Sequence, residues 1–390
     1  MTRQAEGTPG AGGPLAEAGA AIESAYARFV RPLVPLDQPL WDAHAHLGRD
    51  DDGARVETGT LLAEMLDYGV TRAFVVPFAA PEPAGYRELN DRIIDECAGS
   101  EGALVPFCRS QPGEGFAAEL ERALDHGARG IKLHPANGVF DLSHPDLRIA
   151  FALADERSVP LLLHAGRGLV PLAGDLAPLL AEFPDAQVIL AHAAIADMEQ
   201  VLELAAGSPN LSFDSSVWNA LDLHALVAGA APEQILYGTD APYYTAPCAQ
   251  AKLLLALSAA GAGAEVVTQV VWENAARVAE GRSARRLSPP LGGPRLDLPY
   301  GRLRAHEYLL MAIPLIWGRQ ADSVGFLRLA LQSLAGADRP ALEEACRLLE
   351  LAERSWAEEL RTGAQDEILS LSWVTFRLVE LADALILGAV

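Results

Sequence analysis

The sequence predicts an α/β protein, in which a (β/α)8 TIM barrel is followed by an additional C-terminal all-helical domain. The first observation is a series of eight short apolar runs of β type, whose starts lie about 23 to 33 residues apart. The second is that amphipathic helical stretches separate these runs. The third is that no GxGxxG sequence follows the first run, which favours a closed barrel over an open doubly wound sheet.

The predicted elements follow one another in a regular order. Each strand is a short apolar run between polar or turn-forming residues, and the eight lie at Leu40–Ala45, Ala73–Pro77, Ala103–Phe107, Gly130–Leu133, Pro160–Leu163, Gln187–Ala191, Asn210–Phe213 and Ile235–Tyr237. The helices between them repeat apolar residues at i, i+3 and i+4, for example at Thr60–Tyr68, Gly115–His126, Leu172–Phe183, Met198–Ala206, Ala220–Ala228 and, after the last strand, Val266–Glu280.

The regions outside the barrel differ in composition. We expect the barrel to span residues 36–280, preceded over residues 1–35 by a disordered Gly/Pro/Ala-rich tail and a lead-in helix. Residues 281–301 are rich in Pro, Gly and Arg, and we interpret them as a linker. Residues 302–390 contain only helical patterns, near Leu303–Trp317, Ser323–Leu334, Arg339–Arg361 and Asp366–Leu387. This helical domain either packs on the barrel or forms a subunit interface, and we expect a homodimer.

Composition excludes several classes of function. The 390 residues carry 30 Lys and Arg against 52 Asp and Glu, a net charge of −22, which argues against binding to nucleic acid or to an anionic membrane. The four cysteines are too few and too scattered for a disulfide framework or a CxxC zinc site. The N-terminus lacks the features of a secretory signal and no window is apolar enough to span a membrane, so we expect a cytoplasmic protein.

Four histidines and one aspartate follow predicted strands at the end where catalytic residues of a barrel gather. His44 and His46 end the first strand two residues apart, so both are expected to face the barrel axis and to chelate a divalent metal. His164 follows the fifth strand, His192 the sixth and Asp240 the eighth. Any one of these is a weak signal, but all five at the same end of the barrel predict a metal site.

The motifs that carry these residues resemble the amidohydrolase superfamily, and within it the amidohydrolase-related (family 2) branch. They are DAHAHLG, GIKLHP, LLLHAG, ILAHAA, YGTDAP and ENAARV, and they cover roughly residues 38–280. The helical region from residue 302 onward has no counterpart among them. The resemblance implies a metal-dependent hydrolase with a TIM-barrel fold.

The resemblance also implies the role of each residue. It assigns His44, His46, His164 and Asp240 as ligands of one catalytic metal, and His192 as the residue that polarises substrate or water, or that binds a second metal. Three nitrogen ligands and one oxygen ligand suit Zn²⁺, while Mn²⁺, Fe²⁺ or Co²⁺ are alternatives. A metal-activated water is then expected to attack a carbonyl carbon, with Asp240 as base and His192 as hydrogen-bond donor.

Lys132 on the fourth strand leaves the number of metal ions open. Alternation places Lys132 and His134 on the same inward side of that strand, so both, like His192, are candidates to bind a second metal or the substrate. In binuclear members of the superfamily a lysine at this position is carboxylated and bridges two metals, which here would add Lys132 and His192 to the ligand set. The KLHP form is usual in mononuclear relatives, so one ion is favoured. In that case Lys132 pairs with Asp240 or with a carboxylate of the substrate.

Loops after the strands supply candidates for substrate binding. Arg109 and Arg167 are suited to holding a carboxylate, and Trp218 and Tyr243 lie in loops on the same side of the barrel. The leading hypothesis is a hydrolase that acts on an amide, lactone or ester of a small carboxylate-bearing molecule. The alternative is a metal-dependent non-oxidative decarboxylase of an aromatic or enol acid. A barrel without catalytic activity is a third reading, which the five intact positions oppose.

Overall fold

The computed structural model describes most of the chain, over residues 14–50, 53–80, 85–138, 140–166, 169–217, 219–292, 298–336, 339–362 and 371–388. Contacts divide the chain into two compact units. One comprises Val34–Leu296, and the other combines Met1–Leu33 with Asp297–Val390. The disordered tail expected at the N-terminus falls mainly on residues 1–13, which lie outside the described residues. The expected linker, residues 281–301, contains the boundary between the units.

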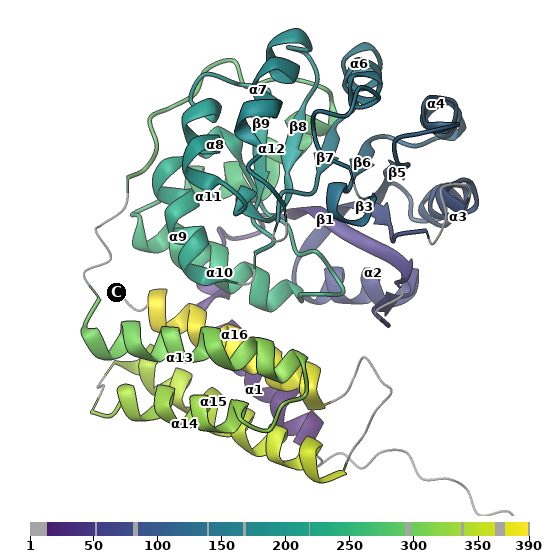
Figure 1. Cartoon of the computed structure of the whole chain (residues 1–390). Coiled ribbons are helices and arrows are strands. Elements are labelled where there is room, and N and C mark those ends of the chain that lie inside the picture. Colours follow the sequence, from purple (N-terminus) through teal and green to yellow (C-terminus); the bar gives the residue numbers. More distant parts are fainter. Residues whose placement is uncertain are drawn as a thin grey trace, which may run out of the picture. The chain divides into compact units, whose positions relative to one another are not determined.

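The strands of the first unit form two sheets (Figure 1). One has the order β2-β1-β3-β4 and the other β10-β9-β8-β7-β6-β5. All pairs are parallel except β1 with the short β2. The strands are β1 Leu40–Arg49, β2 Arg55–Val56, β3 Val70–Pro77, β4 Leu104–Pro106, β5 Cys108–Arg109, β6 Ile131–Leu133, β7 Leu161–Leu163, β8 Val188–Leu190, β9 Leu211–Asp214 and β10 Ile235–Leu236.

Hydrogen bonds join the two sheets at both edges. On one side β4 and β5 are consecutive parts of one strand around Phe107, whose N–H donates to Val75 O at 2.8 Å. On the other side β1 meets the segment after β10, because Ala43 N–H donates to Tyr237 O and His46 N–H to Ala241 O, both at 2.8 Å. Eight parallel strand positions therefore close into a barrel, which confirms the predicted fold class.

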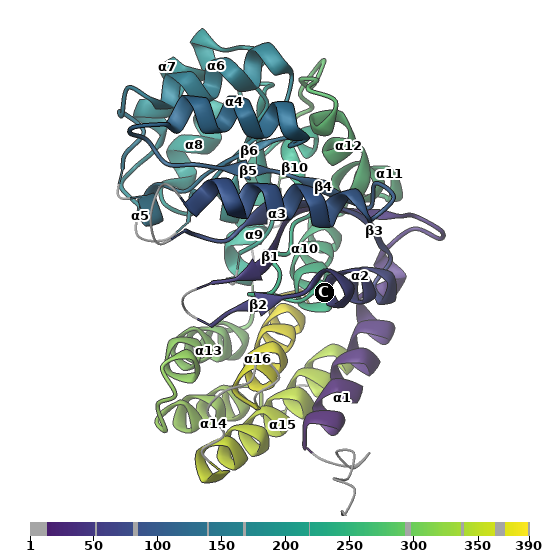
Figure 2. The ribbon, with the colours of Figure 1, turned by 90° about the vertical axis from the view of Figure 1, so that its right-hand side faces the viewer.

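Helices surround the strands of this unit, as Figures 1 and 2 show. They are α2 Thr58–Asp67, α3 Tyr86–Ala98, α4 Phe116–His126, α5 Pro135–Gly138, α6 Leu147–Arg157, α7 Ala173–Glu182, α8 Met198–Ala205, α9 Ala220–Gly229, α10 Ala246–Ala259, α11 Ala264–Thr268 and α12 Asn274–Ala279. The single helix expected over residues 266–280 is interrupted, because a π-helical turn, η5 Gln269–Glu273, separates α11 from α12.

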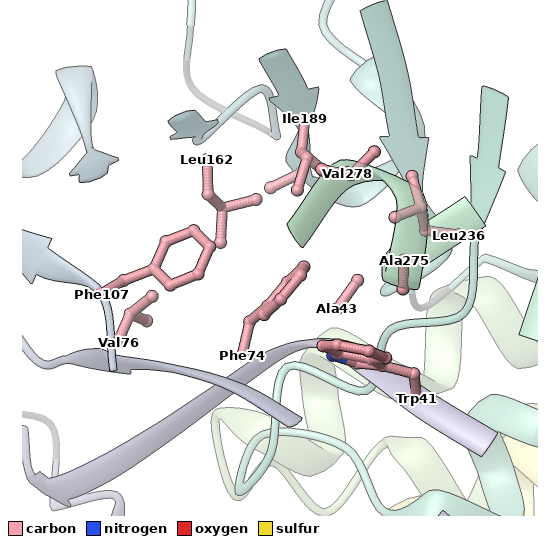
Figure 3. Packing of buried hydrophobic residues seen from close by; sticks show 11 residues of the cluster. Trp41, Ala43, Phe74, Val76, Phe107, Leu162, Ile189, Leu236, Ala275 and Val278 are labelled. Atoms are coloured by element: carbon pink, nitrogen blue, oxygen red, sulfur yellow. The ribbon is translucent and has the colours of Figure 1, made fainter. Parts of the chain in front are cut away.

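An apolar cluster fills the interior of the barrel (Figure 3). Side chains from several strands point toward one another there, and the fully buried members include Phe74, Phe107, Leu162, Ile189 and Leu236. Helix α12 adds Ala275 and Val278 to the same cluster, and Trp41 of β1 packs against Trp272 of η5 with ring centroids 5.4 Å apart. This packed apolar interior is the platform beneath the strand ends that carry the polar residues.

The second unit is helical and is built from both ends of the chain. It contains α1 Pro14–Phe29, α13 Tyr300–Trp317, α14 Ser323–Ser333, α15 Pro340–Thr362 and α16 Leu371–Gly388, with the 3-10 turn η1 Arg31–Leu33 after α1. The expected lead-in helix corresponds to α1, and its contacts are with α15 and α16. Its buried residues, Ala18, Ala21, Ile22, Ala25 and Tyr26, recur at helical spacing and form the packing face. No helix among the described residues has the length and apolar character needed to cross a membrane.

Candidate metal centre

The residues predicted at the strand ends lie together at one end of the barrel. His44 and His46 belong to β1 and Lys132 to β6. His164 directly follows β7, His192 lies two residues after the end of β8, and Asp240 lies four residues after the end of β10. His44, His46, Lys132 and Asp240 are all less than 9 % exposed, whereas His164 and His192 are half-buried. The pairing of β1 with β3 shifts register between Asp42 and Ala45, so β1 does not alternate in the simple way that the sequence suggests.

Two groups of potential metal-binding side chains converge at the strand ends among the described residues: His44, His46 and Asp240, and His44, His192 and Asp214. The first group consists of predicted ligands. The Nε2 atoms of His44 and His46 lie 3.3 and 3.0 Å from Oδ1 of Asp240. The three side chains form a group whose ligand atoms all lie within 4.8 Å of one another. Lys132 Nζ is 3.1 Å from the same Nε2 of His44. Two imidazoles and a carboxylate at this spacing are a suitable donor set for a divalent ion.

His164 contacts His192, and His192 in turn lies beside His44 of this group. His192 Nε2 lies 3.1 Å from His164 Nδ1, and the His192 ring lies 5.4 Å from the His44 ring, centroid to centroid. His134 stacks on His164 with ring centroids 3.9 Å apart and 12° between the planes. A Cβ on Gly166 would lie 2.9 Å from His192 Cδ2 and 3.0 Å from His164 Cε1, so only glycine leaves this contact undisturbed. The assignment of His164 as a metal ligand stays a prediction.

Left-handed backbone conformations hold two of these residues in place. His192 has φ 58° and is followed by Ala193 and Ala194 at φ 55° and 54°, and Asp240 has φ 59°. Residues other than glycine adopt this conformation rarely and at a cost in free energy, and such residues cluster at functional sites. The Asp240 N–H donates to His44 O at 2.6 Å, so the strained residue is tied directly to β1.

A buried carboxylate connects the ends of β1 and β10. Asp42 Oδ1 accepts hydrogen bonds from the N–H groups of His44 and Thr239, each at 2.9 Å, and the Thr239 hydroxyl donates to Asp42 Oδ2. Because Thr239 immediately precedes Asp240, the arrangement fixes both segments that carry the converging ligands. Burial raises the pKa of Asp42 to about 7, although these hydrogen bonds act to lower it.

The electrostatics of the site favour the neutral form of four histidines. Burial, followed by the charge of Lys132, lowers the pKa of His44 to about 4. The pKa values of His46, His134 and His164 are also lowered, mainly by burial, and the charges of Lys132 and Arg109 add to each of these shifts. Burial lowers the pKa of Lys132 to about 7 and raises that of Asp240. Neutral imidazoles are the form that binds a metal, so the residues present fit a divalent ion.

Of the four candidates for substrate binding, two lie in the described part of the chain. Arg109 on β5 is 2 % exposed, and its Nη2 has no hydrogen-bond partner among the described residues. Its guanidinium lies over the ring of Tyr86, 5.6 Å from the centroid. Tyr243 packs edge-on against His46 with ring centroids 6.0 Å apart, and its hydroxyl donates to Asp50 at 2.7 Å. Arg167 and Trp218 lie outside the described residues.

Sequence reasoning missed two acidic residues of the site, Asp214 and Asp42. Asp214 is the last residue of β9 and is fully buried, with Oδ2 2.9 Å from His44 Nδ1. The signal was present, because Asp214 directly follows the predicted strand Asn210–Phe213, and the strand-end rule that identified Asp240 also applies to it. Asp42 lies within the DAHAHLG motif, but only the long-range contact with Thr239 reveals its role.

Comparison with known proteins agrees with this geometry. The sequence profile of the family described as Amidohydrolase (Amidohydro_2) matches residues 41–278. No curated protein matches the chain. Among solved structures, a TIM-barrel protein from Bordetella bronchiseptica is similar with a TM-score of 0.50 and 15 % identity, over 63 % of this chain and 100 % of that one.

Two further solved structures are similar over the same region. A probable 2-pyrone-4,6-dicarboxylic acid hydrolase from Acinetobacter baumannii is 14 % identical, with a TM-score of 0.48, over 62 % of this chain and 98 % of that one. The IDCase of Metarhizium anisopliae is 13 % identical, with a TM-score of 0.47, over 62 % of this chain and 97 % of that one. The sequence identities are low, so these structures are compared with the chain only in fold. The Bordetella protein has the highest of the three TM-scores, and its similarity supports the barrel fold.

Proposed function

The chain belongs to the amidohydrolase family, whose enzymes are metal-dependent hydrolases, and from this premise we propose that it hydrolyses an amide, lactone or ester bond of a small carboxylate-bearing molecule. The observation that carries the proposal is the convergence of His44, His46 and Asp240 at the strand ends of the barrel, with the cationic side chains of Lys132 and Arg109 beside them.

The metal would be held by His44, His46, His164 and Asp240, and Zn²⁺ suits this set of three nitrogens and one oxygen best. When bound, a divalent ion acidifies water and polarises a carbonyl group, so that hydrolysis proceeds at neutral pH. We favour one ion. The short distance from Lys132 Nζ to His44 Nε2, 3.1 Å, supports Lys132 as a direct neighbour of the first metal position, where a carboxylated lysine could hold a second ion.

Asp240 is the general base in this proposal. Burial raises the pKa of its carboxyl group in the metal-free protein, and a higher pKa makes a carboxylate a stronger proton acceptor. Oδ1 faces the histidine nitrogens, so Oδ2 takes the proton from water and passes it to the leaving group. The left-handed backbone of Asp240, tied to His44 O, holds the carboxylate in this orientation.

His192 serves the carbonyl oxygen of the substrate. Its Nδ1 lies 2.7 Å from Ser216 O, and since a carbonyl oxygen only accepts, Nδ1 carries the proton. Nε2 is the ring nitrogen left to face a substrate, and a hydrogen bond from it in the substrate complex would stabilise the negative charge that develops on the carbonyl oxygen.

The carboxylate of the substrate is assigned to Arg109. Arg109 is 2 % exposed, and its Nη2 has no hydrogen-bond partner among the described residues. Burying a guanidinium in this way costs free energy, and an anionic ligand would supply the missing hydrogen bond and neutralise the charge. An arginine binds a carboxylate in a bidentate manner, which would fix the reacting group over the metal position.

The test combines metal analysis with a substrate panel. We expect purified protein to contain or take up about one equivalent of transition metal, and to hydrolyse members of a panel of lactones, esters and amides that carry a carboxylate. Neutral analogues of the same compounds should react more slowly. A protein that cannot bind transition metal would refute the proposal, and release of CO2 from aromatic or enol acids without hydrolysis would favour the decarboxylase alternative.

A further inference from the structure

We propose that the end of β9 sets the tautomers of His44, His192 and His164, with Asp214 as the positioning residue that keeps Nε2 of His44 free to bind a metal. This inference rests on the proposed function for the identity of the ligand. Asp214 is absent from the set of expected ligands, and its role follows from its contacts with two different histidines.

The first contact fixes His44. Asp214 Oδ2 lies 2.9 Å from His44 Nδ1, and both side chains are buried, with 0 % and 1 % exposure. Asp214 Oδ1 accepts hydrogen bonds from two backbone N–H groups and from the Ser216 hydroxyl, and these bonds stabilise the charged form, so the group is a carboxylate. A carboxylate only accepts hydrogen bonds, so the proton of the neutral imidazole sits on Nδ1 and Nε2 keeps its lone pair.

The second contact fixes the strained loop after β8. Asp214 Oδ1 accepts from the N–H of His192 at 3.0 Å and from the N–H of Ser216 at 2.8 Å, and the Ser216 hydroxyl also donates to it. His192 begins three consecutive left-handed residues, and this hydrogen bond anchors the first of them. The carboxylate of Asp214 therefore contacts the His44 ring through Oδ2 and the backbone of His192 through Oδ1.

The tautomers of His192 and then of His164 follow from contacts at the same strand end. His192 Nδ1 donates to Ser216 O at 2.7 Å, so His192 Nε2 is an acceptor. That atom lies 3.1 Å from His164 Nδ1, which therefore donates to it and leaves His164 Nε2 unprotonated. Residues 214–216 thus leave an Nε2 lone pair on both His44 and His164, as a metal site requires.

Asp214→Asn separates the two functions of the carboxylate. Three donors converge on Oδ1, so the amide oxygen of asparagine takes that position and its NH2 group faces His44. Nδ1 of His44 must then accept, and its proton moves to Nε2, where it blocks the metal. The anchor of His192 is retained, so the substitution is expected to invert one tautomer within an otherwise unchanged site.

The experiment measures tautomer and metal affinity in the full chain. In metal-free wild-type protein, ¹⁵N NMR of the histidine rings should show His44 protonated on Nδ1, and in Asp214→Asn protonated on Nε2. Competition with a chromophoric chelator should show that Asp214→Asn weakens Zn²⁺ binding about 10- to 100-fold, the range found when a group that orients a metal ligand is lost.

Two control variants accompany it. Asp155→Asn changes another carboxylate of the barrel that accepts backbone N–H groups, from Asp185 and Ala186, and should leave both readouts at their wild-type values. Ser216→Ala keeps the carboxylate of Asp214 and should leave His44 protonated on Nδ1.

The outcomes are distinguishable. Nε2 protonation of His44 in the wild-type protein would overturn the inference even if Asp214→Asn fails to fold, and so would a Zn²⁺ affinity of Asp214→Asn equal to that of Asp155→Asn. Failure of wild-type protein to bind any transition metal would instead refute the proposed function, while the tautomer of His44 would still test the role of Asp214.

Discussion

At the scale of single residues, the site combines backbone strain with buried charge. His192 and Asp240 hold left-handed conformations, and hydrogen bonds to Asp214 and to His44 O keep them there. The strain costs free energy that the rest of the barrel has to offset. Such strain is expected at a functional site, where a side chain has to be held in one orientation even though this lowers the stability of the fold. It distinguishes His192 and Asp240 from histidines and aspartates with a purely structural role.

Removing a converging ligand should abolish turnover without unfolding the barrel. We expect His44→Ala and Asp240→Asn to bind less metal than wild type and to retain less than a few per cent of the hydrolytic activity. His44→Ala removes one ligand atom of the converging group, and Asp240→Asn replaces a carboxylate by a neutral amide that is a weaker ligand and no base. Metal analysis, activity and circular dichroism would be measured on the same preparations. His126→Ala, whose side chain is 50 % exposed on α4, is the control. Activity of either ligand variant near the control level would contradict the assigned roles.

Asp42 should make stability fall as the pH rises toward neutrality. Burial raises its pKa from 3.8 to about 7, so between these values the folded protein holds a proton that the unfolded chain has lost. The free energy of unfolding therefore decreases from pH 4 to pH 7 and this contribution is constant above, with a change of at most about 4 kcal/mol at 1.36 kcal/mol per pKa unit.

Asp42→Asn removes this contribution because asparagine does not titrate. Urea unfolding of metal-free protein between pH 4 and pH 8 should show the variant gaining stability relative to wild type as the pH rises. Parallel curves for the two proteins would show that Asp42 is ionised throughout this range.

At the scale of elements, the positions of the barrel strands were predictable from the sequence. The exact form of the last helix and the long-range contacts of the strand ends were not. Period, length and composition located all eight strand positions, because a strand buried on both faces is a short apolar run. The histidines at the strand ends followed from the same pattern. The interruption of the last helix by η5 was not predictable, since the apolar spacing of residues 266–280 is compatible with a continuous helix. Contacts such as Asp42 with Thr239 depend on residues 197 positions apart, which periodicity does not reveal.

The apolar interior should dominate the stability of the barrel. Leu162 of β7 is 0 % exposed and lies among Phe107, Ile189 and other members of the cluster. Leu162→Ala should lower the free energy of unfolding by about 2 to 5 kcal/mol, since it removes buried methyl groups and leaves a cavity. Leu66→Ala, at a position that is 80 % exposed, should change it by less than about 0.5 kcal/mol. Equal effects of the two substitutions in urea unfolding would contradict this account.

At the scale of the whole molecule, two chain ends meet in one helical unit. The sequence located α1 and the four C-terminal helices separately, but it gave no sign that α1 packs on α15 and α16, because an apolar face does not identify its partner. The domain limits derived from composition and the homodimer stay predictions, and light scattering of the purified protein would test the dimer.

One substitution tests whether α1 packs against α15 and α16. Ile22 is 7 % exposed, and Ile22→Ala should destabilise the helical unit by about 2 to 5 kcal/mol. Leu15→Ala on the same helix is the control, because Leu15 is 42 % exposed. Urea unfolding followed by circular dichroism should show this loss. Equal effects of Ile22→Ala and Leu15→Ala would contradict the packing of α1 on α15 and α16.

The chain contains only two lysines, and both are buried, Lys132 with 1 % and Lys252 with 2 % exposure. Every cationic side chain at the surface other than a protonated histidine is therefore an arginine. Reagents that acylate or carbamylate lysine amines find no ε-amino group on the outside of the folded protein, and trypsin meets lysine bonds only after unfolding. Lys252 lies within α10, whereas Lys132 lies on β6 with Nζ 3.1 Å from His44 Nε2. Peptide mapping distinguishes the two, so the rate at which Lys132 is modified in the native state would measure reagent access to the candidate metal centre.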